Sequence, residues 1–413
     1  MSDQAPIVIV SARQPTAFSS ALAASNMFPL IDATWDEALD AVARVQPAAV
    51  LVSATGDDMT TFQALAKRLS AKQPYVPLIA IDPVTSLPGH TVPFTQTFGN
   101  FDRLGARLRN ALRVRTLHAT VMRRLTAENV QRTSLQTPDP LEDATVMLIG
   151  RGAGYPALSV AFGERVGVVG ALSIEAAAKH LNSRDLDGIV IGEGFSQRVV
   201  DAFLTVLAED ARFRNLPVVV TTPGLAPSYE LANLEMSSGD AANVAATALP
   251  LVRQHAFEAR LSRALKSIDS DGLLDSDTGL LTRAAFERDF ATAVYQTQSR
   301  GGGLSVARFA FDAVPERARL DAARILSRLM RQMDFGTLQT DGSIVVAFAE
   351  TDLRNAHMIA KRVSSVIKHT MHGPKRDARN DPYVSLATLL PNDNAKSLLA
   401  RLQDDVTRRA AAS

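Results

Sequence analysis

The sequence predicts an α/β protein with two doubly wound parallel sheets followed by a third domain of the α+β class. Strand and helix signals alternate through the first 255 residues, which is typical of doubly wound sheets. The alternation starts twice, so the two halves form an internal repeat. The last third instead carries a helix followed by a hairpin pattern. A chain of 413 residues is also long enough for several domains.

Composition excludes several classes of function. Hydrophobic residues make up 46% and charged residues 21%, as in ordinary folded proteins. The net charge of +1 gives no general attraction to nucleic acids or acidic membranes. Without cysteine there are no disulfides, thiolate metal ligands or cysteine nucleophiles. The apolar run Ile7–Val10 is too short for a signal peptide and no run reaches membrane-spanning length, so we expect a cytoplasmic protein with no nucleic-acid or membrane partner.

The first repeat is read from short apolar runs separated by amphipathic segments. Continuous apolar runs are typical of strands buried on both faces, and apolar residues at helical spacing predict the helices between them. We expect strands at 6–10, 28–31, 48–52 and 77–81, and helices at 35–45, 60–69 and 104–125.

Two prolines at 131–143 predict a linker, after which the pattern restarts. We expect strands at 146–149, 166–169, 188–191 and 217–220, and helices at 173–181, 196–211 and 241–265. The predicted division is a first domain at 1–130, the linker at 131–143, a second domain at 144–255, a connecting helix at 256–271 and a third domain at 272–413. The connecting helix has heptad-like apolar positions, which suit pairing with its copy in a dimer or packing on its own domain.

The third domain is organised around residues 331–344. An apolar helical stripe through Met333 is expected to stop at Gly336. The dipeptide Asp341-Gly342 between two strand-like segments predicts a two-residue type I′ turn. The expected elements are helices at 284–298, 316–333 and 353–370, strands at 304–311 and 383–389, and a hairpin at 337–349.

Each of the first two repeats resembles a response-regulator receiver domain of the flavodoxin-like class. At the end of the third strand, Ser53 and Gly192 replace the aspartate that a receiver phosphorylates. The acid pair that binds Mg²⁺ falls on Ser11 and Ala12, and on Gly150 and Arg151. Aspartyl phosphorylation needs a nucleophilic carboxylate and carboxylates that hold a metal. The resemblance therefore implies two pseudo-receivers, used for dimerisation or partner docking, and no phosphorylation.

Residues 272–413 resemble a GGDEF (diguanylate cyclase) domain. The resemblance lies in Asp275-Ser-Asp-Thr-Gly-Leu280 followed by Arg283 and Phe286, and in the order of elements after it. Together with the two receiver-like repeats, essentially the whole chain resembles the PleD/PopA-like tandem receiver–GGDEF family.

The residues that would perform cyclase chemistry are replaced. Cyclases use carboxylates to hold Mg²⁺ on the triphosphate of GTP. The first of these positions is Ala310, and Gly342 takes the metal-ligand position of the signature, which aligns with Thr340–Ile344. The guanine-binding loop is reduced to 313–315. A one-residue slip would bring Asp341 nearer but leave it a lone carboxylate. We expect no enzyme activity and no bound Mg²⁺.

The same family often has a second, inhibitory site for cyclic di-GMP. It consists of R-x-x-D five residues before the signature and an arginine on the following helix. The matching residues are Arg331, Asp334 and Arg362. Arginine planes stack on guanine and donate to its O6/N7 edge, while the aspartate accepts from N1 and N2. The alternative is that Arg331 and Asp334, three residues apart near a helix end, form an ordinary surface ion pair that contributes little to stability.

The resemblance implies a catalytically inactive cyclic di-GMP receptor or signalling adaptor that needs no cofactor. We expect a homodimer with a protein partner in a signalling, cell-cycle or proteolysis pathway, located in the cytoplasm, with a cell pole as one option. The alternative is a ligand-independent scaffold with three interaction domains. An active cyclase is a third possibility that the replaced residues disfavour.

Overall fold

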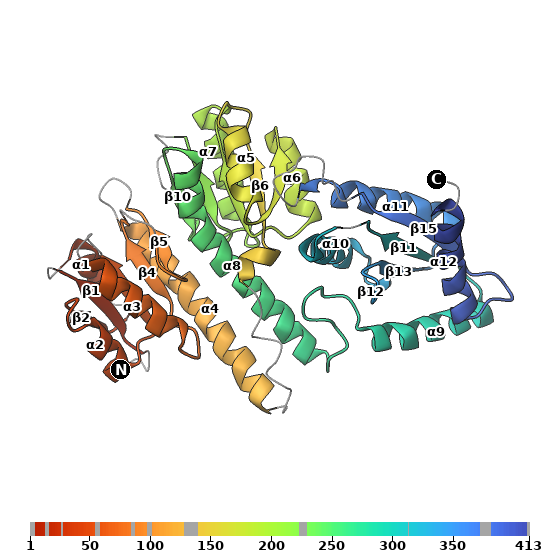
Figure 1. The fold of residues 1–413 in the computed structure, drawn as a ribbon, viewed down its shortest axis with the longest axis horizontal. Coiled ribbons are helices and arrows are strands. Elements are labelled where there is room, and N and C mark those ends of the chain that lie inside the picture. The colour runs from red at the N-terminus through yellow and green to blue at the C-terminus, as the bar shows by residue number, and fades with distance from the viewer. Residues whose placement is uncertain are drawn as a thin grey trace. The chain divides into compact units, whose positions relative to one another are not determined.

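The computed structural model describes residues 5–12, 16–25, 28–53, 58–83, 87–96, 101–127, 139–222, 229–312, 314–371 and 381–410. These residues form three β-sheets with helices on their faces (Figure 1). The chain divides into two compact units. The first comprises Met1–Phe162, Ala171–Ile174 and Leu186–Leu261, and the second Gly163–Gly170, Glu175–Asp185 and Ser262–Ser413. No described helix is long and apolar enough to cross a bilayer.

The first sheet is parallel, with the order β2-β1-β3-β4-β5. This is the flavodoxin-like strand order. Its strands are β1 (Ile7–Ser11), β2 (Leu30–Ala33), β3 (Ala49–Ser53), β4 (Leu78–Ile81) and β5 (Val92–Phe94). Its helices are α1 (Ala17–Ser25), α2 (Ala38–Val45), α3 (Met59–Ser70) and α4 (Asp102–Ala127). The expected strands and helices are all present; β5 and α1 were not predicted.

The apolar runs form strands because both faces of this sheet are covered. Ile7 and Ile9 of β1 pack with residues of α1 and α4 on one face. Val8 and Val10 pack with residues of α2 and α3 on the other. Alternate side chains of a strand point to opposite faces, so a strand between two helical layers is apolar at every position.

The second sheet repeats this strand order, as the internal repeat predicts. Its order is β10-β9-β8-β6-β7-β14. The strands are β6 (Thr145–Ile149), β7 (Gly167–Ala171), β8 (Gly188–Ile191), β9 (Val218–Val220), β10 (Leu234–Met236) and β14 (Thr370–Met371). The helices are α5 (Tyr155–Gly163), α6 (Ile174–Ser183), α7 (Gln197–Glu209) and α8 (Ala241–Asp269). Sequence reasoning missed α5, β10 and β14.

The short strand β14 comes from the last third of the chain. It pairs antiparallel with β7, with Thr370 opposite Val169. The helix predicted at 353–370 is therefore too long, because α11 (Leu353–Ile367) ends before this strand begins. The buried Arg184 guanidinium fixes the junction by donating to the Thr370 hydroxyl and the Val366 carbonyl.

Helix α8 covers the predicted helix at 241–265 and nearly all of the predicted connecting helix at 256–271. Of the predicted linker, 131–138 lies outside the described residues. Its end forms a short 3₁₀ helix, η3 (Pro140–Asp143). The division of the chain into three domains remains a prediction.

The third sheet is antiparallel, with the order β12-β13-β11-β15. Its elements are α9 (Arg283–Arg300), β11 (Leu304–Ala310), α10 (Glu316–Leu329), β12 (Phe335–Leu338), β13 (Ile344–Ala349), α11, β15 (Tyr383–Thr388) and α12 (Ala395–Ala410). Residues of α10 and α11 form the core on one face, and residues of α9 and α12 form the core on the other. This is the α+β arrangement that the sequence predicts; α12 was not predicted.

Two predictions around the hairpin are wrong. Helix α10 ends at Leu329, so Met333 is outside it and 57% exposed. Gly336 lies inside β12 and does not end a helix. A side chain there would begin 2.8 Å from the Val345 carbonyl oxygen, which explains the glycine. Pairing with β13 overrides the helical pattern of this segment.

The hairpin turn also differs from the predicted type I′ turn. Gly342 has φ of 80° and its N–H donates to the Gln339 carbonyl. Asp341 does not have the positive φ that a type I′ turn at Asp341-Gly342 requires. The next pair, Gln339 and Ser343, is hydrogen-bonded at 2.7 Å, so the loop has three residues with a left-handed glycine at its end.

Candidate functional site

The turn between α10 and β12 is closed by the Asp334 carboxylate. Its side chain is buried, with the residue 8% exposed. Oδ2 accepts from the Arg331 N–H at 3.2 Å, and Oδ1 accepts from the Ala349 N–H at 3.2 Å. The Asp334 N–H donates in turn to the Arg331 carbonyl at 3.0 Å. The carboxylate thus fixes the turn and ties it to the end of β13.

Burial raises the pKa of Asp334, and the N–H groups of Arg331 and Ala349 lower it less than burial raises it. Each carboxylate oxygen can accept more than one hydrogen bond. A further donor from a ligand would therefore find an acceptor that is already held in position. It would also offset the cost of keeping this charge away from water.

The two predicted arginines are exposed. Arg331 lies in the turn after α10, and Arg362 lies on α11. Both helices contribute to the core on the same face of the third sheet. Within the described ranges, neither guanidinium makes a hydrogen bond with the protein, and the charge of Arg331 helps to lower the pKa of the nearby Asp334. Their donors are available to a ligand.

The hairpin at the predicted signature holds its own carboxylate. Asp341 Oδ1 accepts from the Ser343 N–H at 2.9 Å and from the Ser343 hydroxyl at 2.6 Å. Its Oδ2 pairs with Arg308 of β11 at 2.7 Å. Burial alone would raise the pKa of Asp341, but Ser343 and Arg308 together lower it. Shifting the alignment by one residue would bring Asp341 toward a metal-ligand position. In the structure, however, the carboxylate of Asp341 is already paired with the Arg308 guanidinium.

The other metal positions do not offer a cluster of ligands. Ala310 ends β11, opposite Tyr383 of β15. Asp312 follows it and is exposed. In the part of the chain that the structure describes, no three His, Asp or Glu side chains come together as a metal site.

The opening motif of the third domain has a structural task. Asp275 Oδ1 accepts from the N–H groups of Asp277 and Thr278 and from the Thr278 hydroxyl at 2.6 Å. This turn directs Leu280 into the core, where it is 1% exposed. The Ser327 hydroxyl of α10 donates to the Gly279 carbonyl. The motif therefore fastens the start of the domain onto α10.

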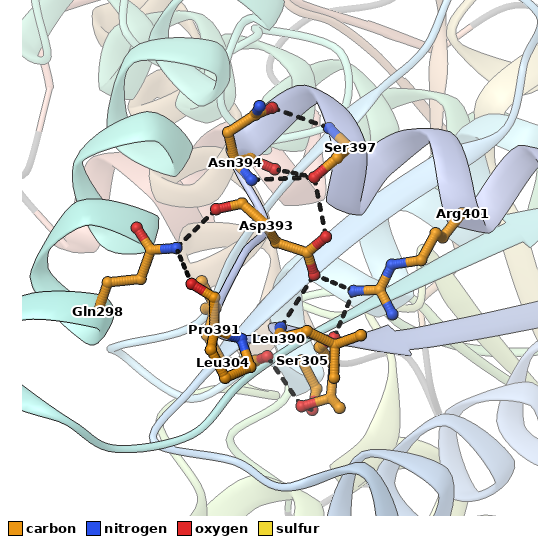
Figure 2. Close-up of polar contacts among 10 residues, drawn as sticks. Gln298, Leu304, Ser305, Leu390, Pro391, Asp393, Asn394, Ser397 and Arg401 are labelled. Atoms are coloured by element: carbon orange, nitrogen blue, oxygen red, sulfur yellow. Dashed lines mark hydrogen bonds and ion pairs between the residues drawn. The ribbon is translucent and has the colours of Figure 1, made fainter.

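A dense polar cluster surrounds Asp393, before α12 (Figure 2). Its carboxylate accepts from the Leu390 N–H at 2.9 Å and from the Ser397 hydroxyl at 2.8 Å, and it pairs with Arg401. The Gln298 amide donates to the Asp393 carbonyl at 2.6 Å. Asp393 and Asn394, followed by leucines at helical spacing, are the sequence signal that could have revealed this helix start.

The receiver-like positions lie at the carboxyl ends of the parallel strands. Ser11 and Ser53 stand opposite each other at the ends of β1 and β3. In the second sheet Gly150 and Gly192 follow β6 and β8. The N–H of Arg151 donates to the Glu193 carbonyl at 3.0 Å, which joins the two loops through the backbone. Serine and glycine at these positions offer no carboxylate to phosphorylate.

No family model matches the sequence, and no curated protein matches it. Solved structures similar to this chain include the coiled coil and GGDEF domain of DgcB from Caulobacter crescentus in complex with c-di-GMP. That match has 16% identity, covers 37% of this chain and 88% of the other, and has a TM-score of 0.31.

A sensory box/GGDEF family protein from Caulobacter crescentus CB15 matches at 20% identity over 34% of this chain and 99% of the other, with a TM-score of 0.29. The FimX GGDEF domain from Pseudomonas aeruginosa is 18% identical in sequence. The match covers 33% of this chain and 94% of the FimX domain, with a TM-score of 0.30. Scores this low carry no argument about function, so the account of the site rests on its residues.

Proposed function

We propose that this protein is a catalytically inactive receptor or adaptor that binds cyclic di-GMP at Arg331, Asp334 and Arg362. One observation carries the proposal. The buried Asp334 carboxylate is held by two backbone N–H groups beside the exposed Arg331, and the exposed Arg362 lies on α11, which packs on the same face of the third sheet as α10. The resemblance to the inhibitory site of GGDEF domains supplies the identity of the ligand.

The chemistry of these groups suits a guanine dinucleotide. A guanidinium is always charged, stacks on a base and donates in pairs to a guanine edge or a phosphate. The Asp334 carboxylate would accept from guanine N1 and N2. Because two backbone N–H groups hold the Asp334 carboxylate, the ligand would meet an acceptor that is already ordered, which lowers the entropic cost of binding.

The absence of catalysis is supported by the residues at the cyclase positions. Ala310 and Gly342 cannot ligate a metal, and Arg308 holds the nearby Asp341. The connection from β11 to α10 spans only 311–315, which leaves no room for a guanine-binding loop. Phosphoryl transfer between two GTP molecules needs metal ions that neutralise the developing charge.

The two parallel sheets are proposed as pseudo-receivers that mediate dimerisation or partner docking. Ser53 and Gly192 stand where a phosphorylated aspartate would be. A ligand-independent scaffold is the second candidate. It is favoured by the Asp334 carboxylate, which already accepts from two backbone N–H groups of the protein.

Two assays on the wild-type protein separate these functions. We expect heat exchange on titration with cyclic di-GMP, and no cyclic dinucleotide after incubation with GTP and Mg²⁺. Saturable binding without synthesis is the result expected of a receptor. No binding of cyclic di-GMP would favour the ligand-independent scaffold. Accumulation of cyclic dinucleotide would show a cyclase. Either outcome would overturn the proposal.

A further inference from the structure

The short strand β14 is held in place by one buried arginine. Arg184, which follows the end of α6, is 1% exposed. Its guanidinium donates to the hydroxyl of the fully buried Thr370 in β14 and to the Val366 carbonyl in α11. Thr370 in turn stands opposite Val169 of β7. All four residues belong to the second compact unit, so this junction is a feature of that unit alone.

Two histidine rings meet beside this arginine. His180 of α6 and His369, which precedes β14, have ring centroids 5.5 Å apart. The Ser365 carbonyl accepts from Nδ1 of His369 and fixes that ring. The Arg184 N–H donates to the His180 carbonyl at 3.2 Å, so both side chains extend from the same helix end. Three basic groups therefore gather where β14 meets α6.

This arrangement favours the neutral form of the His180 ring. Burial is the largest cause, and together with the Arg184 charge and His369 it lowers the pKa of His180 to about 4. If β14 leaves, the ring regains water and loses the contact with His369. Its pKa then returns toward the ordinary histidine value of about 6.5.

The carboxylates around the junction act on other cations. Asp185 pairs with Arg328 of α10, and Lys368 pairs with Asp381 at 3.2 Å. Asp321 of α10 raises the pKa of the buried arginine, which burial lowers. Strand β7 has no ionisable side chain. None of these carboxylates shifts the pKa of the α6 histidine, so a proton on its ring would face the buried guanidinium without a countercharge.

We propose that protonation of His180 releases β14 from β7, which makes this junction sensitive to acid. The closed junction binds fewer protons than the open one. Its stability is therefore fully present above about pH 6.5 and falls as the pH drops from there toward the lower pKa of the closed state. Because the Arg184 guanidinium also holds the Val366 carbonyl, release would free the end of α11. The inference goes beyond cyclic di-GMP binding and requires no ligand.

Hydrogen exchange on the full chain tests the proposal through the amides of β14, with those of β11 in the same unit as the internal control. The comparison is between about pH 7.5 and about pH 5.5, corrected for the pH dependence of the chemical exchange rate. Protection at β14 should fall about threefold to tenfold at the lower pH, because opening takes up a proton. Protection at β11 should stay constant. Unchanged protection at β14, or an equal loss at β11, would overturn the proposal.

A second arm uses His180→Gln, with His357→Gln on the exposed surface of α11 as the matched control. Protection at β14 should no longer depend on pH in His180→Gln, because glutamine does not titrate, and should behave as in wild type in His357→Gln. His369→Gln removes one cause of the lowered pKa, so it should reduce the pH dependence and serves where His180→Gln fails to fold. An unchanged pH dependence in either folded variant contradicts the proposal, as does its loss in His357→Gln.

Discussion

Two aspartates of the third domain show how the surroundings of a residue decide its task. Asp334 is buried and bonded to two backbone N–H groups, which leaves it able to accept from a ligand. Asp341 is bonded to Ser343 and Arg308, which use its charge within the hairpin. The sequence identifies both as carboxylates near a turn. Only the contacts with other strands distinguish them.

Arg107 and Glu235 form a buried ion pair in the first compact unit. Both side chains are fully buried and 2.7 Å apart. Burial lowers the pKa of Arg107, and Glu235 opposes that shift. Arg107 also donates to the carbonyl oxygens of Leu234 in β10 and Pro93 in β5, so it links α4 to both strands.

Glu235→Gln should destabilise the protein by about 3–5 kcal/mol, because it leaves a buried guanidinium without its countercharge. Glu258→Gln is the matched control, since its partner Arg113 is 49% exposed and such pairs contribute about 1 kcal/mol or less. Urea unfolding measures both. If both variants lose the same free energy of unfolding, the burial of the Arg107–Glu235 pair does not make its disruption more destabilising.

At the scale of elements, α12 depends on the cluster around Asp393 (Figure 2). The helix packs Leu398 and Leu402 into the core on one face of the third sheet. Burial acts to raise the pKa of Asp393, but the Leu390 N–H, Ser397 and Arg401 together lower it below its ordinary value. The charged carboxylate is therefore the form that the folded state favours.

Asp393→Ala should cost about 1 kcal/mol at pH 7, because it removes the acceptor of the Leu390 N–H and of the Ser397 hydroxyl. The pKa of Asp393 is lower in the folded state than in the unfolded chain, where it is about 3.9. The stabilisation is therefore fully present above about pH 3.9 and is lost as the pH falls through the pKa of the folded state. Unfolding of wild type and variant across this range should converge in acid. Asp289→Ala, at an exposed pair with Arg288, is the control. A difference that does not change with pH would contradict this role.

The sequence predicts elements well where the physical signal is local. Continuous apolar runs identified most parallel strands, because both faces of these sheets are buried. Strand β5 was missed because it has three residues, one of them Pro93, and β10 because Glu235 interrupts it. The end of α10 was misplaced because pairing of Gly336 with β13 depends on a distant segment. For the same reason, the backbone contacts of Asp334 could not be predicted.

At the scale of the whole molecule, the proposed receptor places ligand binding in the third domain and leaves the two repeated sheets to contacts with partners. The two sheets share one strand order, and the carboxyl ends of their strands lack the expected acids. If cyclic di-GMP changes what the protein binds, the change must start from differential contacts at Arg331, Asp334 and Arg362.

Calorimetric titration of cyclic di-GMP into the wild-type chain, Arg331→Ala, Arg362→Ala and Arg354→Ala tests the central claim most directly. Arg354 is an exposed arginine on the same helix as Arg362 and is the control. We predict saturable binding to wild type and Arg354→Ala, and at least tenfold weaker binding to Arg331→Ala and Arg362→Ala, equivalent to about 1.4 kcal/mol. No binding to wild type, or equal affinity in all four proteins, would contradict it.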